Sequence, residues 1–168
     1  MTRKILTITT LSLSIMLTFG ILSGCNKNSI TVKPGKTLNI PISDITETIS
    51  FIPAIVDDIY MEIIFFKAAD ETIRTAFNTC ERCYITGMGY FVQEDDMVIC
   101  QQCNMSFPAE SVGILAGGCQ PIPIPIEEII TTKKFYKIPY QILSDHTRWF
   151  INWKPEQSPI DTPPSVQL

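Results

Sequence analysis

The sequence predicts a mainly β fold, α+β at most, built around a small antiparallel sheet with few short helices. Two observations support this fold class. Runs of β-branched and aromatic residues have the length of strands and are bounded by Asp, Gly and Pro, which favour turns. Only residues 140–143 resemble a short helical turn, whereas the cysteine-rich middle of the chain contains two further strand-like segments.

Apolar runs in the first half of the chain predict the main part of the sheet. Residues 48–56 and 59–67 flank an acidic pair at 57–58, and two such runs around a short acidic turn are typical of a β-hairpin. Residues 59–67 are almost continuously apolar, which favours a central strand. After another turn, residues 73–77 form a short strand that leads directly into Cys80.

Prolines indicate which segments lie at an edge of the sheet. The alternation over residues 38–42 predicts a half-buried strand, and Pro41 favours an edge because it has no N–H to donate. For the same reason, the Pro-Ile repeat at 120–125 predicts an extended segment on the surface or over the sheet edge. Residues 135–138 are a candidate last strand, followed by the helical turn at 140–143.

Two Cys-x-x-Cys pairs are the main candidate metal ligands in the sequence. Cys80/Cys83 and Cys100/Cys103 are separated by 16 residues, a spacing typical of four-thiolate metal sites. Each turn directs two sulfur atoms at one point, and two turns at the base of a hairpin complete a tetrahedron. Residues 84–99 contain two β-prone segments around a polar tip, so we expect a zinc-ribbon or rubredoxin-like hairpin with two knuckles.

The residue after each cysteine pair predicts a difference between the two knuckles. Asn104 can adopt the left-handed conformation that such a turn often needs, whereas Tyr84 cannot do so at low energetic cost. We therefore expect the first turn to deviate from the usual knuckle geometry.

A further cysteine, Cys119, lies in a Gly-Gly-Cys-Gln-Pro segment whose glycines allow a close backbone approach. It is either an additional candidate ligand, a resolving thiol or a hydrogen-bonding neighbour of the centre, or else a buried free cysteine.

Disulfides are the main alternative to a metal site if the protein is exported. Five thiols remain if Cys25 is lipidated, and an odd number cannot all pair internally. His146 is the only histidine, which excludes Cys2His2 sites.

The N-terminus predicts export and lipidation. A basic pair at 3–4 precedes an apolar run at 5–22, which is the pattern of a secretory signal. The Leu-Ser-Gly-Cys sequence at 22–25 resembles a lipobox, so residues 1–24 are expected to be removed and Cys25 to carry the lipid. The alternative is an uncleaved transmembrane anchor, because the run is about 18 residues long. Either interpretation places the rest of the chain outside the cytoplasm.

These features divide the chain into four parts. They are a lipoprotein signal peptide at 1–24, a lipidated tether at 25–36, a cysteine-rich metal-binding domain at 37–153 and a disordered Pro-rich tail at 154–168. Without the signal peptide the chain has 11 Lys+Arg against 17 Asp+Glu, a net charge of −6. This acidic balance does not suit binding to nucleic acid or anionic lipid, and it tolerates cationic partners.

The cysteines form part of a longer ordered pattern. Its elements are Cys80-x-x-Cys83, Gly89-Tyr90, Val98-Ile99-Cys100-x-x-Cys103-Asn104-Met105-x-Phe107, Gly113 and Gly117-Gly118-Cys119-x-Pro121-Ile122-Pro123. This pattern resembles the FtrD-like family of membrane iron-sulfur proteins, over residues 37–145. Members of that family occur with Ftr-type iron permease systems or are fused to membrane segments, which a lipid anchor replaces here.

The resemblance implies iron handling or electron transfer at the outer face of the membrane. Cys80, Cys83, Cys100 and Cys103 would then be ligands of iron or of an iron-sulfur cluster, with zinc as the alternative metal. The implied partner is an iron permease or a redox protein.

Three functions remain open from the sequence. The first is a non-enzymatic metal-binding lipoprotein in iron uptake or electron transfer, the second a structural zinc-ribbon interaction module, and the third a thiol-disulfide redox protein. The sequence contains no Gly-x-Ser-x-Gly, no His-Glu-x-x-His and no Gly-rich phosphate loop. We therefore do not expect a hydrolase.

Overall fold

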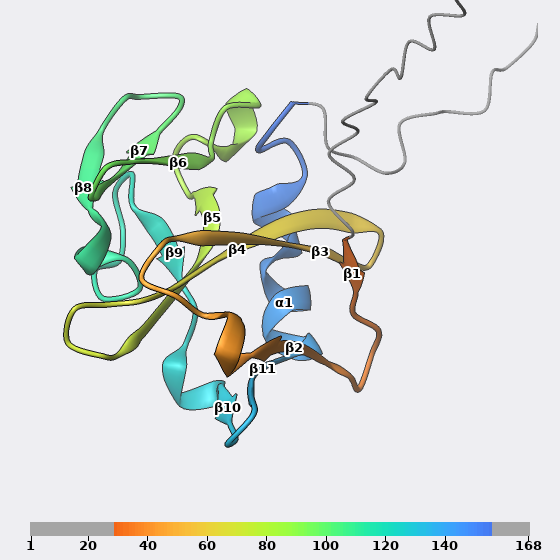
Figure 1. Ribbon diagram of the computed structural model, residues 1–168. Helices are drawn as coiled ribbons and strands as arrows, with labels where there is room; N and C mark the ends of the chain where they lie inside the picture. Colours follow the sequence, from red (N-terminus) through yellow and green to blue (C-terminus); the bar gives the residue numbers. More distant parts are fainter. Residues whose placement is uncertain (1–28, 156–168) are drawn as a thin grey trace, which may run out of the picture.

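The computed structural model describes residues 29–155 and confirms a mainly β fold (Figure 1). Its five-stranded sheet has the strand order β1-β3-β4-β5-β9. The strands are β1 (Ile30–Thr31), β3 (Ser50–Val56), β4 (Ile59–Lys67), β5 (Ile73–Cys80) and β9 (Pro121–Pro123). As predicted, the most apolar run forms the central strand β4, which is buried along almost its whole length. The proline-rich segment becomes the edge strand β9.

The predicted hairpin joins β3 to β4. Its register pairs Val56 with Ile59, so that only Asp57 and Asp58 remain in the turn, with φ of 50° and 62°. A two-residue turn with both residues left-handed matches the twist of the flanking strands, and Asp tolerates this conformation better than most residues. The acidic pair thus determines where β3 ends and β4 begins.

A second sheet has the order β10-β11-β2. Its strands are β10 (Ile130–Thr131), β11 (Phe135–Pro139) and β2 (Thr37–Pro41), and β2 lies at the edge as Pro41 predicted. Helix α1 (Tyr140–His146) follows β11, as expected, and continues into the 3-10 turn η5 (Thr147–Phe150). Further 3-10 turns are η1 (Ile42–Asp44), η2 (Tyr84–Thr86), η3 (Ala109–Ser111) and η4 (Ile126–Glu128).

The third sheet contains the cysteine hairpin. It consists of β6 (Phe91–Glu94), β7 (Met97–Cys100) and β8 (Ser106–Pro108). The register pairs Phe91 with Cys100 and Glu94 with Met97, which confirms the hairpin predicted between the two cysteine pairs. Strand β8 was not predicted. It is a three-residue segment that ends in proline and pairs with the free edge of β7.

Alternate side chains of β4 separate the interior into two hydrophobic clusters. Ile63 and Phe65 face a cluster shared with the second sheet, α1 and η5, whereas Ile64 and Phe66 face a cluster shared with the cysteine hairpin. The second cluster also contains Cys80, Cys83 and Cys100 together with Phe91, Val98 and Val112. Three of the candidate ligands are therefore part of the hydrophobic core.

Packing contacts extend beyond both ends of the range 37–153. Residues 30–31 of the predicted tether form β1, which pairs in parallel with β3, and Val32 is only 3% exposed. This segment consists of β-branched residues, which favour strands, and it pairs with the free edge of β3. Lys154, which was assigned to the tail, contacts Glu62 inside the domain. The predicted signal peptide, the lipid site Cys25 and residues 156–168 of the tail lie outside the described residues.

In residues 29–155 no helix combines the length and the apolar character needed to cross a bilayer.

Candidate metal centre

The first cysteine turn leaves the sheet at the end of β5. Cys80 is the last residue of that strand, and its N–H donates to the carbonyl of Gly89 at 2.9 Å. The N–H of Cys83 donates back to the carbonyl of Cys80 at 3.1 Å, which brings the two side chains to the same side. Tyr84 then begins η2, and the left-handed residue is Gly87, with φ of 79°. The first turn thus deviates from a simple knuckle, as Tyr84 predicted.

Gly89 packs directly on this turn. A Cβ atom at residue 89 would lie 2.4 Å from the Cα and N atoms of Tyr84. No side chain fits there unless the backbone moves, so glycine is required for the close approach of the two segments. The same approach allows the hydrogen bond between Gly89 and Cys80 that fixes the end of β5.

The second turn follows β7 and has the expected knuckle geometry. Cys100 ends the strand, and Asn104 is left-handed with φ of 57°, as predicted. The N–H of Asn104 donates to the carbonyl of Cys100 at 2.9 Å, and the N–H of Cys100 donates to the carbonyl of Met105 at 3.0 Å. These bonds place the exposed Cys103 beside the buried Cys100.

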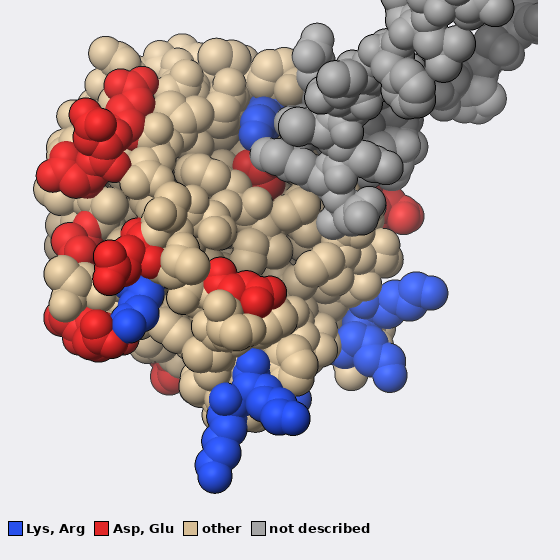
Figure 2. Space-filling model, in the orientation of Figure 1, with Lys and Arg blue, Asp and Glu red and all other residues tan. Residues whose placement is uncertain are grey.

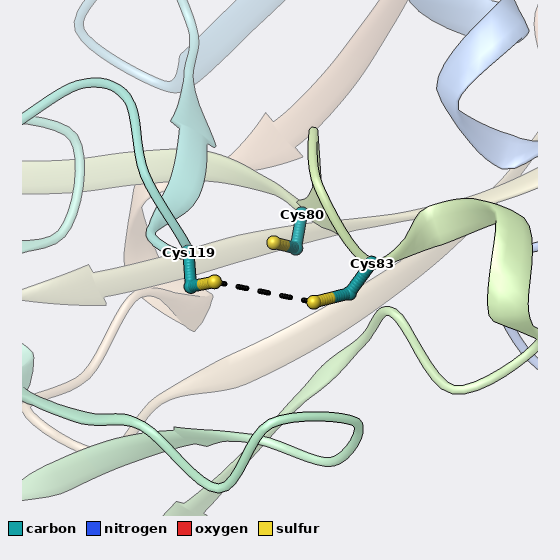
Figure 3. A group of neighbouring side chains, drawn as sticks. All are labelled: Cys80, Cys83 and Cys119. Atoms are coloured by element: carbon teal, nitrogen blue, oxygen red, sulfur yellow. Dashed lines mark hydrogen bonds between the residues drawn. The ribbon is translucent and has the colours of Figure 1, made fainter.

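A third segment brings Cys119 to the centre. The loop before β9 contains Gly117 and Gly118 with φ of 87° and 66°, which only glycine adopts easily. The carbonyl of Gly118 lies 3.9 Å from the sulfur of Cys80. The sulfur of Cys119 lies 4.0 Å from that of Cys83, and Figure 3 shows the two side chains pointing toward each other. The thiol that the sequence left open is therefore part of the site.

The five thiols form two overlapping groups of three. Cys80, Cys83 and Cys119 have sulfur atoms within 4.8 Å of one another, and so do Cys83, Cys100 and Cys103. The structure thus brings together all five cysteines that the sequence singled out in the domain. It does not place the four predicted ligands in one mutual group, because Cys83 alone is common to both triads. All five are free thiols in the structure.

Burial differs across the centre and changes the acidity of the thiols. Cys80, Cys83 and Cys100 are buried, Cys119 is half-buried and Cys103 is exposed. Burial, assisted by neighbouring thiols, raises the pKa of Cys83 well above its usual range. Burial also raises the pKa of Cys100, and it raises the pKa of Cys119 to about 11. Burial opposes ionisation of Cys103, but the N–H of Met105 and the adjacent thiols together lower its pKa.

A buried polar network supports the strand that carries Cys80, and sequence reasoning missed it. The Glu62 carboxylate, 1% exposed, accepts hydrogen bonds from Tyr60 at 2.8 Å, Asn78 at 2.9 Å and Lys154 at 3.0 Å. The side-chain oxygen of Asn78 accepts from the N–H of Phe91 at 2.9 Å, which ties β5 to the cysteine hairpin. The available signal was a single acidic residue inside the apolar run of β4.

The single histidine belongs to neither group of thiols. The ring of His146 stacks on Phe77 with centroids 4.4 Å apart, and its Nδ1 is 2.7 Å from the carbonyl of Ile142. Its position on α1 therefore serves packing of the first hydrophobic cluster.

Comparison with protein families identifies a family to which the chain is similar. Residues 42–150 match the FtrD-like family, described as membrane iron-sulfur containing proteins. The chain belongs to this family. The matched range contains both cysteine pairs and Cys119, together with most of the first and third sheets. No curated protein and no solved structure matches the chain.

The residues of the centre fit a thiolate-bound metal. Thiolates are soft ligands that suit zinc, iron and iron-sulfur clusters. A tetrahedral ion with metal-sulfur bonds of about 2.3 Å requires sulfur atoms about 3.8 Å apart. The observed distance of 4.0 Å between Cys83 and Cys119 and the limit of 4.8 Å within each triad are close to this value.

Proposed function

We propose that the protein is a non-enzymatic, membrane-anchored, extracytoplasmic metal-binding lipoprotein that supports iron uptake or electron transfer. The observation that carries this proposal is the convergence of five thiols from three chain segments at the boundary of a hydrophobic cluster. Membership of a family described as membrane iron-sulfur containing supports iron or an iron-sulfur cluster as the cofactor, and zinc is the alternative.

The buried and the exposed cysteines would have different roles at such a centre. Cys80, Cys83 and Cys100 would hold the metal from the buried side, where apolar neighbours such as Phe91 exclude water. Cys103, which is exposed, would complete the ligand set on the side that solvent and a partner reach. Bound iron would supply a change of oxidation state, and backbone N–H groups near the sulfur atoms of Cys100 and Cys103 would tune its potential.

The surface charge supports a cationic cargo over nucleic acid. Figure 2 shows acidic side chains gathered over the side that carries the β6-β7-β8 sheet, and basic side chains mainly toward the second sheet. Glu94, Asp95 and Asp96 are exposed at the tip of the cysteine hairpin. A negative field on this side raises the local concentration of metal cations and repels phosphate backbones.

The anchoring part of the proposal rests on the sequence before residue 29. Lipidation of Cys25 would hold the domain at the outer face of the membrane, next to an iron permease or a redox partner. Replacement Cys25→Ser is expected to abolish incorporation of labelled fatty acid and to release the domain from the membrane fraction or leave the precursor unprocessed. Unchanged labelling in this variant would contradict lipidation at Cys25.

Metal analysis tests the central claim. The full chain, purified without added metal or reductant, is expected to contain iron or zinc and to show its clustered thiols only after denaturation. Replacement Cys83→Ser should remove the metal because Cys83 belongs to both triads, whereas Cys25→Ser, outside the centre, should retain it. Protein that contains no metal and no free thiols would contradict a metal centre.

Two further functions each have an observation in their favour. The inclusion of Cys80, Cys83 and Cys100 in a hydrophobic cluster favours a structural zinc-ribbon module, which would contain zinc and show no redox change on loading with iron. The 4.0 Å distance between the sulfur atoms of Cys83 and Cys119 favours a thiol-disulfide redox protein. In that case Cys119→Ser should abolish thiol exchange, and the purified protein should be free of metal.

A further inference from the structure

The sharing of Cys83 is the feature that a single four-cysteine site does not explain. Each triad combines sulfur atoms from two chain segments. The first joins the end of β5 and its turn to the loop before β9, and the second joins the same turn to the end of β7. A mononuclear site on the two Cys-x-x-Cys pairs would leave Cys119 unused although its sulfur lies 4.0 Å from that of Cys83.

We propose that the centre is dinuclear. One metal ion is held by Cys80, Cys83 and Cys119, a second by Cys83, Cys100 and Cys103, and the Cys83 thiolate bridges the two. This inference rests on the proposed metal-binding function and specifies how the thiols are divided. The ligand class is a soft or borderline divalent cation that accepts thiolate sulfur, such as Fe²⁺, Zn²⁺ or Co²⁺.

The geometry of the first triad suits an ion of its own. Figure 3 shows Cys80 and Cys83, from the end of β5 and its turn, and Cys119, from the loop before β9, extending toward a common region. Tetrahedral coordination requires sulfur atoms about 3.8 Å apart, so sulfurs within 4.8 Å need to move by less than about 1 Å to bind one ion. The two glycines before Cys119 allow the loop to make this movement at low cost.

Charge also favours two ions over one. Four thiolates around one divalent ion carry a net charge of −2 and leave a fifth thiol beside it. Five thiolates around two divalent ions carry a net charge of −1. Because three of the five cysteines are buried among apolar side chains, the arrangement with the smaller net charge has the lower desolvation cost.

The two ions differ in their access to solvent. The first triad contains two buried cysteines, Cys80 and Cys83, and the half-buried Cys119, whereas the second includes the exposed Cys103. With three protein ligands each, both ions keep an open fourth position. The ion on the second triad is therefore the one that exchanges with solvent or meets an external ligand first.

A cobalt titration tests the proposal. The full chain is fully reduced and titrated with Co²⁺ under anaerobic conditions, while the sulfur-to-cobalt charge-transfer band is recorded. We expect the band to saturate at two equivalents. The electron paramagnetic resonance signal per cobalt should be weaker at two equivalents than at one, because a bridging thiolate couples the two ions magnetically.

Single variants identify the ligands of each ion. Replacement Cys119→Ser is expected to reduce the stoichiometry from two to one by removing the first triad, and Cys103→Ser to do so by removing the second. The matched control Cys25→Ser lies outside the centre and should still bind two. Circular dichroism before and after reduction checks that each variant is folded, and Cys103, being exposed, is the position least able to affect folding.

The outcomes separate this proposal from the proposed function. Saturation at one equivalent, unchanged in Cys119→Ser, would overturn the dinuclear centre and leave a single four-thiolate site in place. Two equivalents with no loss of signal per cobalt would overturn the bridge. The absence of any charge-transfer band in the folded, reduced chain would overturn both the dinuclear centre and the metal-binding function.

Discussion

Gly89 shows how closely two segments approach at the first cysteine turn. Its Cα leaves no room for a Cβ, which would lie 2.4 Å from the backbone of Tyr84. We therefore expect Gly89→Ala to displace this turn, to lower the free energy of unfolding by about 3 kcal/mol and to weaken metal binding. Denaturant unfolding and metal titration of the same samples measure the two effects.

Gly35 provides the matched control. It is a turn glycine with φ of 72°, and nothing lies within 4 Å of the position of its Cβ. Gly35→Ala is expected to cost about 1 kcal/mol through backbone strain alone, with no change in metal binding. Equal effects of the two substitutions on metal binding would show that Gly89 has no special role at the centre.

Lys154 neutralises the buried carboxylate of Glu62. Its Nζ lies 3.0 Å from the carboxylate, and the two side chains are 16% and 1% exposed. Because Lys154→Met leaves a buried charge without its counterion, we expect the free energy of unfolding to fall by about 3 kcal/mol. Lys67, whose partner Glu71 is largely exposed, is the control, and Lys67→Met should leave stability almost unchanged. Urea unfolding measures both variants. Equal unfolding midpoints for Lys154→Met and Lys67→Met would contradict this expectation.

At the scale of elements, Asn78 joins the large sheet to the cysteine hairpin. It donates to Glu62 on β4 and accepts from the N–H of Phe91 on β6, while being 1% exposed. Asn78→Leu leaves both groups without this partner in the interior, which should cost about 2 kcal/mol. Amide hydrogen exchange of Phe91 should also become faster, because its N–H is no longer bonded.

A second asparagine tests whether burial causes that effect. Asn39 accepts a hydrogen bond from Thr37 on the edge strand β2, where both residues are at the surface. Asn39→Leu is expected to change stability by less than about 0.5 kcal/mol. A similar loss in both variants would mean that the connection between β5 and β6 contributes little.

Strands with a clear hydrophobic or turn pattern in the sequence could be predicted. Short strands that form by pairing with the free edge of another strand could not. The hairpin of β3 and β4 followed from two apolar runs around Asp57 and Asp58, and the edge position of β2 followed from Pro41. Strands β1 and β8 have two and three residues, respectively, which is too short for a periodic hydrophobic pattern. They form because β3 and β7 offer unpaired backbone groups, and this is a property of the folded sheet rather than of the local sequence.

At the scale of the whole molecule, the sequence identified the thiols but not how they are divided. Spacing alone predicted Cys80, Cys83, Cys100 and Cys103 as one set. The position of Cys83 between two triads depends on how the loop carrying Cys119 packs against the turn after β5, which no spacing rule describes. The partnership of Glu62 and Lys154 also joins distant parts of the chain. Both features required the tertiary structure.

The acidity of the buried thiols predicts how metal binding depends on pH. Burial raises the pKa of Cys83 and Cys100 and raises that of Cys119 to about 11, so these thiols are protonated at pH 7 in the metal-free protein. Each thiol that becomes a ligand must lose its proton, and binding is therefore favoured as pH rises and opposed as pH falls.

The expected size of this dependence is large enough to test. Every proton released contributes about a tenfold change in apparent affinity per pH unit while the pH stays below the pKa of that thiol. Titrations with Zn²⁺ at pH 6, 7 and 8 should show tightening at each step, and the protons released at pH 7, measured in weakly buffered solution, should include those of the three raised thiols. Affinity that is constant over this range would mean that oxygen or water ligands, not the clustered thiolates, hold the metal.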